Sequence, residues 1–204
     1  MRLLFNENIN DIKFKKILEN YIRLLKINGN KSKDIMLIVP NNTAKIKYER
    51  QLSLNYSEEL NITTYIGFVK RELIKYWPIV SETCELIQKK VISPIFIPNS
   101  LSEYIMTNQV KKKRDLEGYF EDLTSTNKNI ANSISTNINK AALGLIDFKT
   151  IGEKIYLSKK NRDKLLKFSY SQMNEIIDYY IYTLLSNSMV DNSLSVYPVS
   201  YTHL

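Results

Sequence analysis

Five apolar residues, a proline and two asparagines follow one another in Ile35-Met36-Leu37-Ile38-Val39-Pro40-Asn41-Asn42. A short, unbroken apolar run that ends at a proline is typical of a buried β-strand. Because both faces of such a strand are apolar, the run favours a parallel sheet that helices cover on each side. The stretch therefore predicts a central strand of an α/β domain.

Helical and extended patterns alternate on either side of this strand. Before it, Met1 to Phe5 reads as a strand, and apolar residues recur at helical spacing from Asp11 until Gly29 ends the run. After it, we expect a helix over residues 43–54, a strand over 60–65 and a helix over 66–77 that ends before Pro78. This alternation predicts an α/β fold with parallel strands at the amino terminus.

The chain changes character after Pro78. Three prolines, Pro78, Pro94 and Pro98, punctuate a junction, and the patterns beyond it are mainly helical with connections rich in Asn, Ser and Thr. Helices are expected over residues 100–110, 115–123, 130–146, 148–158 and 171–186. We therefore predict two regions, an α/β domain over residues 1–78 and an incomplete, mainly helical domain over residues 79–197.

The last residues form a stretch with an unusual coding property. Val199-Ser200-Tyr201-Thr202-His203-Leu204 can be encoded by the end sequence of a transposon that is used to prepare sequencing libraries. Pro198 fits the same reading frame, so we expect residues 198–204 to be a translated adapter and the natural sequence to stop near Tyr197. The single histidine, His203, lies in this tail and is therefore not expected to act as a catalytic base or metal ligand.

The composition is that of a globular protein with an excess of positive charge. Hydrophobic residues make up 44% of the chain and charged residues 25%, which excludes a disordered protein. A formal charge of +8 favours an anionic partner such as nucleic acid, although AT-rich codons would also supply many Lys, Ile, Asn and Tyr residues. No apolar run is long enough for a membrane span, so we expect no membrane partner and a cytoplasmic location. A single cysteine, Cys84, excludes an intramolecular disulfide.

The first strand is followed by a loop in the place where a nucleotide-binding protein has its phosphate loop. Its sequence is Asn6-Glu7-Asn8-Ile9-Asn10-Asp11-Ile12-Lys13, which contains no glycine and no Lys-Ser/Thr pair. A phosphate cradle needs the backbone freedom of glycine, and the carboxylates of Glu7 and Asp11 would repel a triphosphate. The favoured interpretation is a solvated loop in which Asp11 caps the helix.

Three blocks of the sequence together resemble the first domain of superfamily-one DNA helicases of the UvrD/Rep type, which include the AddB-like subunits of recombination nucleases. They are the strand-loop-helix from Leu3 to Leu25, the stretch 35–42, which is similar to the family's LVPN block, and the stretch 62–73, which is similar to its TFHSFA block. The resemblance implies a parallel sheet of P-loop-NTPase/helicase type followed by a mainly helical insertion domain. It implies ATP and magnesium as cofactors of the full-length protein only.

In that family the second and third blocks lie at the carboxyl ends of sheet strands and contact single-stranded DNA. By position, the resemblance assigns phosphate contacts to Asn41, Asn42, Thr64, Lys45 and Arg71, and base stacking to Tyr65 and Phe68. Each candidate also has a structural interpretation. The asparagines suit a turn or helix cap, Phe68 suits a core, and the basic residues suit a solvated helix face.

The resemblance predicts a protein of DNA repair or recombination that binds single-stranded DNA and that, in this piece, neither hydrolyses ATP nor unwinds DNA. The alternative is a non-enzymatic scaffold that binds a partner subunit in a helicase–nuclease complex. An unrelated nucleotide enzyme is favoured least, because the sequence offers no paired catalytic carboxylates and no metal-binding cluster. The basic run 111–114 could contact duplex DNA, but such runs usually form solvated turns.

Overall fold

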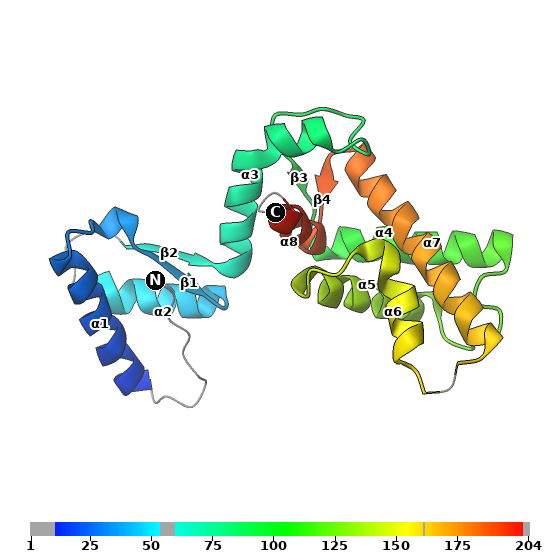
Figure 1. The fold of residues 1–204 in the computed structure, drawn as a ribbon, viewed down its shortest axis with the longest axis horizontal. Coiled ribbons are helices and arrows are strands. Elements are labelled where there is room, and N and C mark those ends of the chain that lie inside the picture. The colour runs from blue at the N-terminus through cyan, green and yellow to red at the C-terminus, as the bar shows by residue number, and fades with distance from the viewer. Residues whose placement is uncertain (1–10, 54–59, 161, 202–204) are drawn as a thin grey trace. The chain divides into compact units, whose positions relative to one another are not determined.

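The computed structural model describes residues 11–53, 60–160 and 162–201. Contacts between residues divide the chain into two compact units, Met1–Phe68 and Val69–Leu204. Among the described residues, eight α-helices account for most of the chain, and the strands form two short parallel pairs (Figure 1). Each unit contains one of these pairs.

The amino-terminal unit is a β-α-β arrangement preceded by a helix. Its elements are α1 (Asp11–Ile27), the 3-10 turn η1 (Ser32–Asp34), β1 (Met36–Val39), α2 (Asn42–Ser53) and β2 (Asn61–Thr64). The two strands are parallel, with Met36 opposite Asn61 and Val39 opposite Thr64. Parallel neighbours need a crossover connection, and α2 lies in it. The predicted order of helix, strand, helix and strand over this part of the chain is confirmed.

The core of this unit lies on one face of the strand pair. It joins side chains of both helices to one face of the strands through Leu18, Ile22, Val39, Leu52 and Ile62. The alternate residues of β1 point the other way, and Met36 and Ile38 are 39% and 45% exposed. Within the described residues, the pair is therefore covered on one face only.

The predicted fold class is wrong. A sheet of the P-loop type has central strands with helices on both faces, whereas β1 and β2 are four residues long and leave one face of β1 exposed. The region predicted to be a mainly helical insertion contains a parallel pair of its own, which was not predicted. An unbroken apolar run shows that the side chains are apolar, but it does not show that they are buried. Met36 and Ile38 are apolar and exposed, and the prediction of a strand buried on both faces was wrong for this reason. The predicted strand over residues 1–5 lies outside the described residues.

The carboxyl-terminal unit is mainly helical. Following α3 (Tyr65–Thr83), its elements are β3 (Ile95–Phe96), α4 (Asn99–Glu117), α5 (Asn127–Leu143), the 3-10 turn η2 (Phe148–Thr150), α6 (Ile151–Ser158), α7 (Lys164–Ser186), β4 (Met189–Val190) and α8 (Asn192–Tyr201). β3 pairs in parallel with β4, so that Ile95 lies opposite Met189. The backbone N–H of Ile97 also donates to the carbonyl of Val190 at 3.0 Å. This short pair brings together segments that are far apart in the sequence.

Helix α3 passes through Pro78, where the sequence predicts its end. A proline inside a helix removes a backbone donor and clashes with the carbonyl four residues earlier, at a cost of about 3 kcal/mol. Trp77 is fully buried, its indole N–H donates to the carbonyl of Val91 at 3.1 Å, and Val80 is buried in the next turn. Burial of large apolar side chains contributes about 1.5–3 kcal/mol each, which offsets the cost of the proline.

The helix predicted over residues 115–123 is not a separate element. Helix α4 continues to Glu117, and Gly118 then adopts a left-handed conformation with φ of 67°. Glycine takes this conformation without the steric cost that a Cβ would add, so the helix ends there. Helix α8 was not predicted. It begins beside Asp191, whose carboxylate accepts a hydrogen bond from the backbone N–H of Leu194 at 2.7 Å.

Candidate nucleic-acid interface

The carboxyl ends of β1 and β2 lie side by side in the amino-terminal unit. The register sets Val39 opposite Thr64, so both strands end at the same edge of the pair. Two residues, Pro40 and Asn41, separate the end of β1 at Val39 from the start of α2, and α3 begins directly after Thr64. The amino termini of two helices therefore meet this edge, which is the position at which open parallel sheets commonly bind ligands.

Asn41 caps the first of these helices. Its side-chain oxygen accepts a hydrogen bond from the backbone N–H of Ala44 at 2.8 Å, and its carbonyl accepts one from Lys45 at 3.0 Å. Asparagine is among the preferred residues at this position because its oxygen satisfies an N–H that has no acceptor within the helix. The structural interpretation of Asn41 as a cap is therefore confirmed. Its amide nitrogen points to no acceptor among the described residues.

Thr64 caps the amino terminus of α3 in the same way. Its hydroxyl oxygen accepts a hydrogen bond from the backbone N–H of Gly67 at 3.0 Å. A Cβ on Gly67 would lie 2.9 Å from the hydroxyl oxygen of Thr63 and 3.1 Å from that of Thr64. The glycine thus permits the close approach that the cap requires. Gly67 was not among the predicted site residues, although a threonine at a strand end followed three residues later by glycine is a usable signal.

The two aromatic candidates differ in exposure. Tyr65 is the first residue of α3 and is 41% exposed, so part of its ring is available to a ligand at the edge. Phe68 lies one turn further along the same helix and is half-buried. Of the two, Tyr65 fits base stacking better, because a stacking side chain must present a ring face.

The polar and basic candidates are dispersed. Asn42 is the exposed first residue of α2, and Lys45 lies in the first turn of the same helix. The ammonium of Lys45 lies 3.6 Å from the carboxylate of Glu49, an exposed pair that is worth little energy and can exchange for a phosphate. Arg71 lies in the other compact unit, 3.6 Å from Glu72. The structure therefore places Asn41, Thr64 and Tyr65 where the strands end and the helices begin, with Asn42 and Lys45 in the first turn of α2 and Phe68 in the first turn of α3.

The electrostatics of the edge favour an anion. The first N–H groups of a helix have no acceptor within the helix, and the peptide dipoles add roughly half a positive charge at each amino terminus. Two such termini, α2 and α3, begin at adjacent strand ends. Phosphates bind helix amino termini for this reason.

The loop predicted to be a degenerate phosphate site falls mostly outside the described residues. Its last three residues, 11–13, form the start of α1, which agrees with a helix that begins at Asp11. Among the residues that the structure describes, no group of three or more His, Cys, Asp or Glu side chains could hold a metal ion.

The basic run 111–114 is partly used within the protein. Lys113 forms an ion pair of 2.7 Å with Glu117 on the next turn of α4. The guanidinium of Arg114 donates to the carbonyl of Ser125 at 2.8 Å and to the side-chain oxygen of Asn127 at 3.1 Å, and it also donates to the carbonyl of Leu123. Arg114 therefore holds the connection between α4 and α5, and only the first two lysines of the run project freely from exposed positions.

A scan against known protein families and a search of curated proteins found no match to this chain. Within the described residues, no helix combines the length and the apolar character that crossing a bilayer requires.

Proposed function

We propose that this chain binds single-stranded DNA at the carboxyl edge of β1 and β2, as part of a helicase-like protein of DNA repair or recombination. The observation that supports the proposal is the register of the strands, which sets the ends of β1 and β2 and the amino termini of α2 and α3 at one edge. Three residues assigned to DNA contact by the family resemblance, Asn41, Thr64 and Tyr65, lie where these strands end and these helices begin.

The binding mode follows from the chemistry of the edge. The backbone N–H groups at the start of the two helices and the amide nitrogen of Asn41 are donors for phosphate oxygens. The exposed ring of Tyr65 is available to a base, and such stacking contributes about 1–3 kcal/mol per base. Neither contact distinguishes one base from another, so binding is independent of sequence.

The proposal assigns no ATPase activity to this chain. The loop 6–13 lacks the glycines and the Lys-Ser/Thr pair that would hold a triphosphate. Unwinding is likewise not expected of these 204 residues.

A second candidate function has a specific observation in its favour. The side-chain oxygens of Asn41 and Thr64 are already engaged as helix caps, so these residues have a structural reason to be present without any DNA. This favours the alternative of a scaffold that binds a partner subunit of a helicase–nuclease complex. The two candidates differ in the salt dependence of DNA binding, because phosphate contacts weaken as salt rises.

The test is the affinity of the chain for a labelled thymidine oligonucleotide of about 16 nucleotides, measured by fluorescence anisotropy as salt rises from about 0.05 to about 0.2 M. With Lys45 neutralising about one phosphate, we expect the logarithm of the binding constant to fall with a slope of about −0.7 against the logarithm of the salt concentration. A chain that shows no saturable binding at the lowest salt is a scaffold instead.

A further inference from the structure

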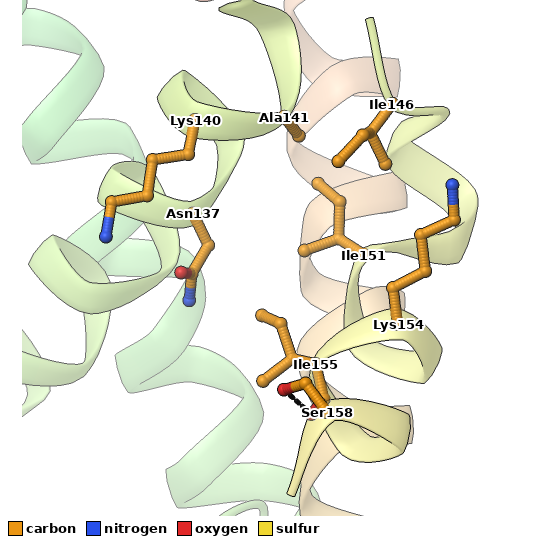
Figure 2. A pocket seen from close by; sticks show the side chains of 8 residues that line it. All are labelled: Asn137, Lys140, Ala141, Ile146, Ile151, Lys154, Ile155 and Ser158. Carbon is orange, nitrogen blue, oxygen red and sulfur yellow. Dashed lines mark hydrogen bonds between the residues drawn. The ribbon is translucent and has the colours of Figure 1, made fainter. Parts of the chain in front are cut away.

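A pocket of about 220 Å³ opens between α5 and α6 in the carboxyl-terminal unit (Figure 2). Its floor is apolar and includes Ala141, Ile146, Ile151 and Ile155. It shares no residue with the strand edge described above, and it lies in the other compact unit. The proposed binding of DNA at the strand edge therefore assigns no role to this pocket.

The turn after α5 builds one wall of the pocket. The backbone N–H of Gly144 donates to the carbonyl of Lys140 at 2.9 Å, and that of Ile146 donates to the carbonyl of Ala141 at 2.9 Å. Between them, Leu145 adopts a left-handed conformation with φ of 54°. Hydrogen bonds of this pattern fold the residue after a helix end back against the last helical turn. Ile146 therefore lines the pocket together with Ala141.

Two lysines flank the apolar floor. Figure 2 shows the ammonium groups of Lys140, on α5, and Lys154, on α6, on opposite sides of the pocket. Neither ammonium pairs with a carboxylate within the described part of the chain. Further basic residues, Lys159, Lys160 and Arg162, follow the pocket residue Ser158 in the sequence. The surroundings of the pocket therefore favour an anionic occupant.

The size of the pocket limits what can occupy it. Sites for metabolites and cofactors enclose roughly 300–1,000 Å³ and bury most of the ligand. The present pocket is smaller and open, so it suits a single apolar side chain that a larger molecule inserts. An exposed nucleic acid backbone would instead place phosphates over isoleucines that cannot hydrogen-bond to them.

We propose that this pocket receives one branched apolar side chain from an acidic segment of a partner protein, with Lys140 and Lys154 contacting the carboxylates on either side of that side chain. The apolar floor supplies the anchor, and the two flanking charges select an acidic neighbour. The site is separate from the strand edge, so it does not depend on whether that edge binds DNA.

The test uses the 204-residue chain and a short fluorescein-labelled peptide that carries one central leucine between acidic residues. We expect weak, saturable binding with a dissociation constant of about 10⁻⁴ to 10⁻³ M, because one anchor and a few surface charges are involved. Backbone amide resonances of residues 137–158 should shift on titration. A peptide with serine in place of leucine should not bind.

Two variants and a charge-matched control sharpen the test. The double variant Lys140→Ala/Lys154→Ala should weaken binding about threefold to thirtyfold. The control Lys111→Ala/Lys128→Ala removes two exposed lysines from the same unit and should change nothing. The variant Ser158→Trp, at an exposed rim position, should block the pocket and abolish binding.

Three results would each overturn the proposal. The first is the absence of saturable binding up to about 10 mM peptide in low salt. The second is equal loss of affinity in the control and in the Lys140→Ala/Lys154→Ala variant. The third is a thymidine oligonucleotide that shifts the same amide resonances more strongly than the peptide does, which would identify the partner as nucleic acid.

Discussion

Asn41, two residues beyond the end of β1, and Thr64, the last residue of β2, cap the two helices that follow, each by accepting a hydrogen bond from the backbone N–H three residues ahead. The distances are 2.8 Å to the nitrogen of Ala44 and 3.0 Å to that of Gly67. The same local device, repeated on two strands in register, aligns the amino termini of α2 and α3 at one edge. The caps therefore shape the proposed DNA-binding edge even where they do not touch the ligand.

Replacement of Thr64 tests its role as the cap of α3. Thr64→Ala removes the hydroxyl that accepts from Gly67 and should lower the free energy of unfolding by about 1 kcal/mol. Thr64→Ser keeps the acceptor and should preserve most of the stability. The amide hydrogen of Gly67 reports the cap directly, since it should exchange with solvent faster in Thr64→Ala only. Equal exchange rates in both variants would show that the cap does not hold in solution.

Gly152 should be intolerant of a side chain. A Cβ at this position would collide with the backbone carbonyl of Tyr170 and would lie 2.9 Å from the side-chain oxygen of Asn174, which already accepts from the N–H of Gly152. Since a backbone atom cannot move aside, Gly152→Ala should destabilise the protein by about 1–3 kcal/mol despite the better helix propensity of alanine. Thermal unfolding checks this, with Glu153→Ala on the exposed side of the same helix as control. A Gly152→Ala protein as stable as the control would mean that α6 and α7 do not pack this closely.

The buried pair of Tyr180 and Asp191 predicts instability at high pH. The hydroxyl of Tyr180 donates to the carboxylate of Asp191 at 2.7 Å, and burial, together with the charge of Asp191, raises the pKa of Tyr180 well above 10. Above about pH 10 the unfolded chain loses this proton while the folded chain keeps it, so stability is present below that pH and falls as pH rises. Burial and the hydrogen bond to Glu175 raise the pKa of Tyr119 in the same direction.

Tyr180→Phe tests this linkage. The variant should lose about 1–3 kcal/mol near neutral pH, because one oxygen of the buried carboxylate loses its donor. Its stability should then fall less steeply than that of the wild type between about pH 9 and pH 11, as urea unfolding would show. Parallel curves for the two proteins would contradict the assigned proton.

Arg114 should behave as a structural residue and not as a DNA contact. Its guanidinium donates to carbonyls of the connection between α4 and α5, so Arg114→Ala should destabilise the protein by about 1.5–3 kcal/mol. Lys111→Ala, in the same basic run but exposed, should leave stability unchanged. If Arg114→Ala weakened binding of duplex DNA at unchanged stability, the assignment would be reversed.

The helices and strands of the amino-terminal unit could be predicted from the sequence, but which of their faces are buried could not. Periodicity located α1, β1, α2 and β2 to within a few residues because each has a clear apolar pattern and a clear stop. The same pattern cannot tell whether the far face of a strand is covered, and Ile38 proved exposed. The strands β3 and β4, of two residues each, carry no period at all, so the second parallel pair could not be foreseen.

Of the structural roles of the candidate residues, only some could be predicted from the sequence, and their contact with DNA stays a prediction. The positions of Asn41 and Thr64 at strand ends followed from the sequence, and the cap was one of the two interpretations of Asn41. The cap by Thr64 and the need for Gly67 depend on how α3 starts, which the pattern of apolar residues does not report. Likewise, the stop expected at Pro78 failed because the burial of Trp77 outweighs a local rule.

The claim that the edge of β1 and β2 binds single-stranded DNA is tested most directly by comparing Tyr65→Ala with Tyr65→Phe. Both replace one exposed side chain at the start of α3, and only phenylalanine retains a ring that can stack. We predict that Tyr65→Ala lowers the affinity for a thymidine oligonucleotide about 5- to 150-fold, whereas Tyr65→Phe binds as the wild type does. Equal affinity of Tyr65→Ala and the wild type would contradict the claim.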